Sequence, residues 1–177
     1  MQVALIIVAH HEEMEAEIPI LPTLLSRAGW RVVILNPIGG WNWVPSLVRY
    51  ASLVGRLGSD APEKIKKEAF EAAKILGCEK VIWDYETPFD PKLWNEVSRR
   101  LAELLVKVGP ELVFIHWPLD NHPDHRIIAR ISRHTLIGVQ RFSFFVERTD
   151  WNPTWSEVYA YQAGIAQTYD FWPDVLV

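Results

Sequence analysis

The residue types that could do chemistry gather in two short stretches of the sequence. Three histidines and two aspartates lie within residues 116–125, directly after the apolar run 112–115. A second cluster, His10-His11-Glu12-Glu13, follows the apolar run 3–8. Imidazole and carboxylate together are the usual ligand set of a catalytic zinc ion. If the two apolar runs are strands of one sheet, the sequence predicts a metal site where the clusters meet.

The spacing within these clusters suggests roles for individual side chains. His10 and Glu13 are three residues apart at the start of an expected helix, a spacing that places two side chains on one face. Glu12 would then point elsewhere, near the metal but available as a base. His125 opens a later helix and can supply a third ligand. Three protein ligands leave one position for water, whose pKa a metal ion lowers to about 7, so we expect a metal-bound water as nucleophile.

Other interpretations of the same residues are weaker. A dinucleotide site would need Gly-x-Gly-x-x-Gly after the first strand, whereas residues 10–15 contain no glycine. A single histidine at a strand end is more often solvated than a ligand, and Asp120 or Asp124 alone could be a turn residue. Two such clusters at equivalent positions of a parallel sheet favour the metal site.

Strands and helices alternate along the chain and would position both clusters. Continuous apolar runs predict strands at 3–8, 31–35, 80–83 and 112–115, and helical periodicity predicts helices at about 13–28, 60–76, 90–108 and 123–137. Two further strands are expected at 142–145 and 157–161. This pattern is typical of an α/β fold, a three-layer α/β/α Rossmann-like sandwich with a mainly parallel sheet, here as one domain over 1–177. In such sheets ligands bind beyond the carboxyl ends of the strands.

Composition limits the class of partner. A net charge of −4 without any Lys/Arg-rich run argues against nucleic acid, and no apolar stretch reaches the ~20 residues of a membrane span. Cys78 is the only cysteine, which excludes an intrachain disulfide and fits the cytoplasm. Trp41 and Trp43 lie in a Gly/Pro-rich loop, where they are either packing or oligomer contacts or aromatic platforms for a sugar.

Two motifs resemble those of a known family. Ala9-His10-His11-Glu12-Glu13 and His122-Pro123-Asp124-His125 are similar to Ala-His-Pro-Asp-Asp and His-x-Asp-His of the PIG-L/LmbE-type deacetylases. Glu68, Ala72 and Leu76-Gly77 also match a middle helix of that family, so the resemblance covers about residues 2–138. These enzymes are zinc hydrolases that remove acyl groups from N-acetylglucosamine-like amino sugars.

The resemblance implies a set of roles that agrees with the spacing. His10, Glu13 and His125 would bind zinc, with another divalent metal as the alternative, and Glu12 would activate the water. The chain would then be a metal-dependent amide hydrolase, a deacetylase of a small N-acyl amino-sugar substrate.

Three residues of the second cluster receive supporting roles from the same resemblance. His122 would stabilise the oxyanion or protonate the leaving amine, and Asp124 would hold His122 in orientation. Asp120 would contact the substrate or support a metal ligand.

The chain departs from the family pattern at three places. Glutamates replace both aspartates of the first motif, and His11 replaces its proline, adding a nitrogen donor that would close the open position if it bound the metal. The chain also stops earlier than family members usually do. Since the family often forms hexamers or other homo-oligomers, we expect a homo-oligomer, a trimer or a hexamer. The alternatives are a non-catalytic metal-binding or oligomeric protein on the same fold, and a hydrolase of another bond, such as a thiol-conjugate amide.

Overall fold

The fold is built on a sheet of five parallel strands. The computed structural model describes residues 1–11, 13–14, 19–39, 61–86, 89–120, 122–145 and 158–161. The strands are β1 (Val3–Ile7), β2 (Arg31–Ile38), β3 (Glu79–Tyr85), β4 (Leu112–His116) and β5 (Val158–Tyr161). They lie in the order β3-β2-β1-β4-β5, and every neighbouring pair is parallel.

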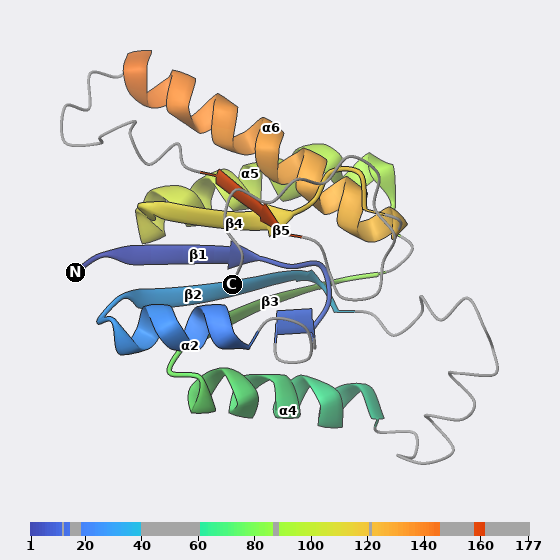
Figure 1. Ribbon diagram of the computed structural model, residues 1–177. Coiled ribbons are helices and arrows are strands. Elements are labelled where there is room, and N and C mark those ends of the chain that lie inside the picture. Colours follow the sequence, from blue (N-terminus) through green and yellow to red (C-terminus); the bar gives the residue numbers. More distant parts are fainter. Residues whose placement is uncertain are drawn as a thin grey trace.

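Helices cover both faces of this sheet. They are α2 (Ile20–Arg27), α4 (Ala61–Ile75), α5 (Trp94–Val108, preceded by the 3₁₀ turn η2, Pro91–Leu93) and α6 (Pro123–Phe145). Figure 1 shows α2 and α4 on one side of the sheet and α5 and α6 on the other. The three-layer α/β/α sandwich expected from the sequence is therefore confirmed.

Local sequence explains why these elements form where they do. All five residues of β1 are buried, which matches its uninterrupted apolar run. The segment before α5 starts at Asp90, whose carboxylate accepts the Lys92 N–H at 2.9 Å. Gly109 ends α5 in the left-handed conformation (φ 59°), which glycine adopts without strain. The buried stripe of α5 then packs on the sheet through Val97, Leu101, Leu105 and Val108.

The C-terminal half of α6 differs from the sequence-based prediction. Residues 142–145 were expected to form a strand, but α6 continues from Pro123 through Gly138 to Phe145. Part of this extension follows a buried stripe, because Ile128, Ile131, Thr135 and Val139 recur at spacings of three or four residues and reach past Gly138. An isolated glycine inside a helix costs only about 1 kcal/mol, which packing of this kind offsets. The strand expected at 157–161 does form, as β5.

The strand order determines where a ligand site can lie. β1 stands between β2 and β4, so the chain winds away from β1 in opposite directions in the two halves of the sheet. The carboxyl ends of β1 and β4 therefore flank the topological switch point, where open α/β sheets bind their ligands. Both polar clusters follow these two strands.

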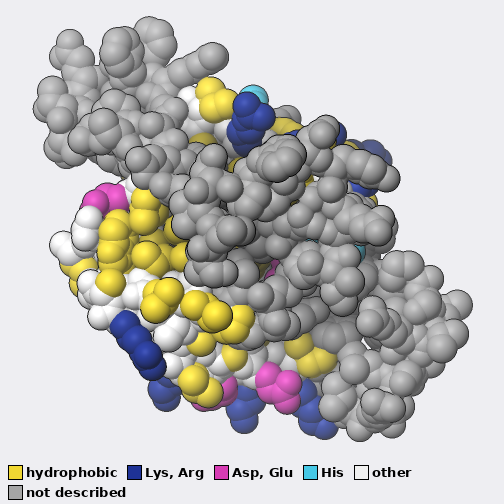
Figure 2. Space-filling model, viewed as in Figure 1, with side chains coloured by type: hydrophobic (Ala, Val, Ile, Leu, Met, Phe, Trp, Pro, Cys, Tyr) yellow, Lys and Arg dark blue, Asp and Glu magenta, His cyan; other side chains and the backbone are white. Residues whose placement is uncertain are grey.

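The outer face of α4 is charged. Figure 2 shows acidic and basic side chains alternating along the lower edge of the molecule, where Figure 1 places α4. Glu63, Lys64, Lys67, Glu68 and Glu71 are exposed, as expected of a solvated helix face. None of the helices among the described residues combines the length and apolar character needed to cross a bilayer.

Candidate metal centre

Glu13 lies at the middle of a buried group of histidines. Its Oε1 is 2.6 Å from Nδ1 of His10 and 2.5 Å from Nε2 of His125. Its Oε2 accepts the His10 backbone N–H at 2.9 Å and lies 3.1 Å from Nε2 of His116. Burial works to raise the pKa of Glu13, but the charges of His116 and His10, together with the hydrogen bond from His10, outweigh burial and hold that pKa well below its usual value. The carboxylate is therefore ionised and shared among three imidazoles.

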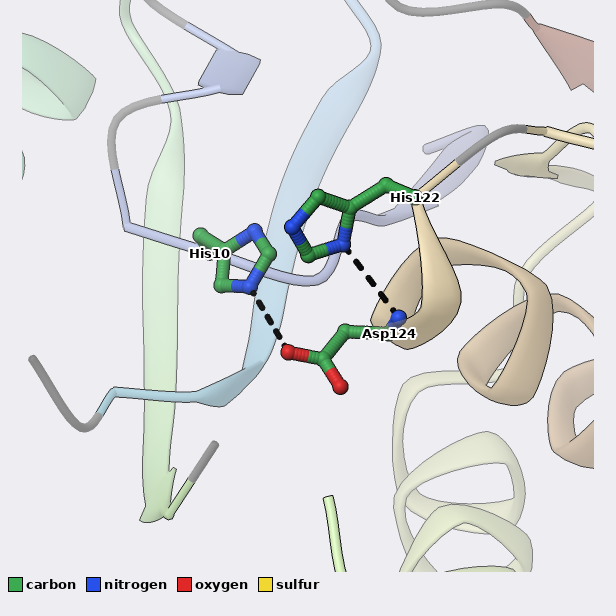
Figure 3. Close-up of side chains that lie close together, drawn as sticks. All are labelled: His10, His122 and Asp124. Atoms are coloured by element: carbon green, nitrogen blue, oxygen red, sulfur yellow. Dashed lines mark hydrogen bonds and ion pairs between the residues drawn. The ribbon is translucent and has the colours of Figure 1, made fainter. Parts of the chain in front are cut away.

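The His10 imidazole connects the two polar clusters. Its Nδ1 faces Glu13, while its Nε2 lies 3.3 Å from Oδ2 of Asp124 in the first turn of α6 (Figure 3). The other oxygen of Asp124 accepts the backbone N–H of Phe89 at 3.1 Å, which fixes the carboxylate in place. His10 thus has a buried carboxylate on each ring nitrogen.

His125 has the same arrangement. Its Nε2 faces Glu13, and its Nδ1 lies 3.3 Å from Oδ2 of Asp120, a fully buried carboxylate. Burial works to lower the pKa of His125, but the hydrogen bonds and charges of Asp120 and Glu13 outweigh burial and raise it to about 9. In the absence of a metal, the two carboxylates therefore draw a proton onto His125. A site that attracts a proton in this way is one that favours a cation.

His116 belongs to the same cluster. It is fully buried, stacks on the His125 ring with centroids 4.0 Å apart, and its Nε2 accepts the Ala9 N–H at 2.8 Å. Burial is the main reason that its pKa is lowered. From the sequence this histidine received no role; in the structure its Nε2 lies 3.1 Å from Oε2 of Glu13.

His122 lies at the edge of the group, only partly buried. Its ring is 5.0 Å from that of His10 and 4.5 Å from that of His125, between centroids. Its Nδ1 accepts the backbone N–H of Asp124 at 3.2 Å (Figure 3). Because a backbone N–H can only donate, the neutral ring carries its proton on Nε2. Burial, together with the charges of His125 and His10, lowers the pKa of His122 to about 4, which favours that neutral form.

His11 is directed toward β3. Its Nε2 lies 3.5 Å from Oδ1 of Asp84, and Asp84 in turn pairs with Lys66. Burial lowers the pKa of His11 to about 4. Among the described residues, no group of metal-ligating atoms includes His11, so the geometry gives no support to His11 as a fourth ligand.

The donor chemistry of the cluster fits a divalent transition metal. One ligand atom from each of His10, Glu13 and His125 lies within 4.8 Å of the other two, and all three side chains are buried. Two imidazoles and one carboxylate form a common catalytic zinc set. The carboxylates of Asp124 and Asp120 on the far ring nitrogens are the outer partners that such histidines need. Two further groups satisfy the same distance criterion, His10-His122-Asp124 and His116-Asp120-His125.

The structure thus brings together six of the seven residues singled out from the sequence. The seventh, Glu12, lies outside the described residues, as do Trp41 and Trp43. Sequence reasoning missed Phe89, whose contribution is a backbone N–H and leaves no signature in the residue type.

Gly39 is expected to tolerate no side chain. A Cβ at this position would lie 2.6 Å from Nε2 of His11 and 2.8 Å from Cα of Asp84, closer than such contacts occur. We predict that Gly39→Ala lowers the free energy of unfolding by about 1–3 kcal/mol, the usual cost of overpacking, as measured by chemical denaturation. Gly138→Ala is the matched control, because nothing lies within 4 Å of its Cβ position and a helical alanine should stabilise α6. Equal effects at the two positions would contradict this packing argument.

Comparison with known proteins adds family information to this geometry. The family model described as PIG-L, GlcNAc-PI de-N-acetylase, matches residues 5–136, which include both polar clusters. Among curated proteins, none matches the chain.

Several solved structures share the fold at low sequence identity. N,N'-diacetylchitobiose deacetylase from Pyrococcus horikoshii aligns with a TM-score of 0.64 and 22% identity, covering 85% of this chain and 57% of that one. The 4-carboxy-2-hydroxymuconate hydratase from Pseudomonas putida aligns with a TM-score of 0.63 and 22% identity over 77% of this chain and 56% of that one. A deacetylase of the A40926 pseudoaglycone aligns with a TM-score of 0.63 and 16% identity, covering 96% of this chain and 69% of that one. This chain therefore spans less than two thirds of the length of the first two proteins. Since a hydratase shares the fold with deacetylases, the reaction has to be argued from the site.

Proposed function

Because the chain belongs to the PIG-L (GlcNAc-PI de-N-acetylase) family, we propose that it is a metal-dependent amide hydrolase. Its substrate would be a small N-acyl compound, an N-acetylglucosamine-like amino sugar or a conjugate of one. The observation that carries this proposal is the convergence of His10, Glu13 and His125 from the carboxyl ends of two strands at the switch point of the sheet.

His10, Glu13 and His125 would hold the metal, with zinc favoured by the donor set. Bound there, a zinc ion would polarise the acyl carbonyl and lower the pKa of water. The carboxylates of Asp124 and Asp120 would keep the two imidazoles in orientation through their far nitrogens, as their 3.3 Å distances suggest. Of the two roles considered for Asp120, its complete burial behind His125 supports this one over contact with substrate.

Two residues would move or hold protons during hydrolysis. Glu12 would accept the proton of the attacking water, as its place in the family motif implies. His122 would donate a hydrogen bond from Nε2 to the oxygen that gains negative charge, since its Nδ1 already accepts the Asp124 N–H. Its low pKa favours this role over protonation of the leaving amine.

The direct test is to remove the metal and restore it. The purified chain would be stripped with a chelator, reloaded with Zn²⁺ or another divalent cation, and assayed for acetate release from N-acetylglucosamine and its conjugates. We expect loss of activity on stripping, recovery with zinc, and a stabilisation of about 2.7 kcal/mol when zinc is present at 100 times its Kd.

Each result of this test assigns a different function. Stoichiometric zinc without acetate release from any substrate would favour a non-catalytic metal-binding protein. Release of a different acyl group or cleavage of a thiol-conjugate amide would keep the hydrolase and change its substrate. A chain that binds no divalent cation would contradict the proposal as a whole.

A further inference from the structure

Asn36 is a polar residue in the middle of the buried sheet. Its side chain is fully buried within β2, in a strand whose preceding four residues are apolar and also buried. Asparagine is depleted in strands, and a buried amide costs about 1–3 kcal/mol unless it finds hydrogen-bond partners. Asn36 therefore needs hydrogen-bond partners here, and an apolar residue at this position could not bond to them.

The partners of Asn36 are two carbonyl groups in the segment that directly follows β1. Its Nδ2 donates to the carbonyl oxygen of Val8 at 3.3 Å and to that of His10 at 2.5 Å. The second of these belongs to a residue of the candidate metal centre. One buried amide thus joins the residue that follows β1 to the first residue of the site.

Pro37 explains why a side chain, and not the backbone, has to donate a hydrogen bond to the Val8 carbonyl. Ile7 is paired with Leu35, and the Val8 N–H donates to the Leu35 carbonyl at 3.0 Å. Donors recur at every second residue of a parallel ladder, so the next bond, to the Val8 carbonyl, would come from residue 37. Proline has no N–H to give, and the amide of Asn36 reaches that carbonyl instead. Backbone pairing resumes where Ile38 N–H donates to the Ala9 carbonyl at 3.0 Å.

This interruption leaves both backbone groups of His10 bound by side chains. Its N–H donates to Oε2 of Glu13, and its carbonyl accepts from Asn36. The next carbonyl, that of His11, accepts from Nζ of Lys80 on β3 at 2.6 Å. The backbone that carries the His10 imidazole is therefore held by the side chains of Asn36, Lys80 and Glu13, in addition to the backbone bond at the Ala9 carbonyl.

We infer that Asn36 is a positioning residue that sets the place of His10 relative to Glu13 and His125. The inference rests on the proposed metal site and adds a determinant of its geometry from outside the two motifs. Asn36 touches none of the imidazole or carboxylate groups in its described contacts, and it would act through the backbone of His10.

The experiment compares zinc affinity with stability in Asn36→Leu. Zn²⁺ binding to the stripped protein would be measured by competition with a chelator, and the stability of the metal-free protein by chemical denaturation. We expect zinc affinity to fall by about 10–100-fold, the usual effect of losing a partner outside the ligand shell. Thr135→Val is the matched control, since it removes a buried hydrogen bond within α6 and should lower stability without changing zinc affinity.

A double variant separates positioning from folding and also serves if Asn36→Leu folds poorly. Asn36→Leu/Pro37→Val returns an N–H that can reach the Val8 carbonyl but leaves the His10 carbonyl without its donor. We expect stability to recover while zinc affinity stays low.

The inference is overturned if the double variant regains full zinc affinity, or if Asn36→Leu binds zinc as tightly as Thr135→Val does. A wild-type chain that binds no zinc would instead contradict the proposed function.

Discussion

Replacing Glu13 with glutamine is expected to abolish zinc binding at concentrations that saturate the wild-type chain. The substitution keeps the shape of the side chain but removes the charge that Glu13 shares with His10 and His125, at 2.6 and 2.5 Å. Because Glu13 is a proposed ligand, the loss of affinity should exceed the about 10–100-fold that an outer partner costs. Isothermal titration of the stripped protein with Zn²⁺ measures it.

Glu103→Gln is the matched control for this substitution. Glu103 is an exposed residue of α5 that pairs with Arg99 one turn away, so the same chemical change there should leave zinc affinity unaltered. If Glu13→Gln retained wild-type affinity, the ligand set would have to be one of the two groups that omit Glu13.

Replacing Glu12 with glutamine is expected to abolish turnover while zinc stays bound, in contrast to the loss of zinc expected for Glu13→Gln. A general base contributes about 10²–10⁴-fold to the rate, and glutamine cannot accept a proton. The measurement is kcat for acetate release by the zinc-loaded variant, together with its metal content.

The two glutamate variants together test whether Glu12 and Glu13 have different roles, one as a base and the other as a metal ligand. Glu12→Gln should keep its zinc and lose kcat, whereas Glu13→Gln should lose the zinc itself. Retained turnover in Glu12→Gln would show that another group takes the proton.

The parts of the fold that could be predicted are those determined by local pattern. The apolar runs preceding His10 and His116 indicated buried parallel strands, and alternation with helices placed both clusters at one edge of the sheet. The end of α6 could not be predicted in this way. Residues 142–145 are apolar and aromatic enough for a strand, yet the helix that begins at Pro123 continues through them, and its buried stripe can be followed to Val139. Only the tertiary structure shows what that stripe packs against.

In the candidate site, the residue types could be predicted from the sequence but the orientations of the side chains could not. The residue types His, Asp and Glu were visible in the sequence, and the structure groups the described ones. Their orientations depend on contacts that the sequence does not reveal. Asp124 was expected to orient His122, and its backbone N–H donates to that ring, while its carboxylate reaches His10, a contact that the sequence did not indicate. His11 faces Asp84 because the approach of Gly39 and the end of β3 decide its direction.

The distance along the chain between the two polar clusters has a consequence for unfolding. Glu13 and His125, two of the proposed ligands, are 112 residues apart in sequence, yet their side chains lie 2.5 Å apart. An ion held jointly by the segments after β1 and β4 would act as a cross-link that closes a loop of this size. In the chain-entropy account, closing a loop of about 100 residues lowers the conformational entropy of the unfolded chain. This loss stabilises the native state by about 4.7 kcal/mol. The central strands could then separate only after the ion had left, and the lifetime of the native fold would follow the rate of metal release.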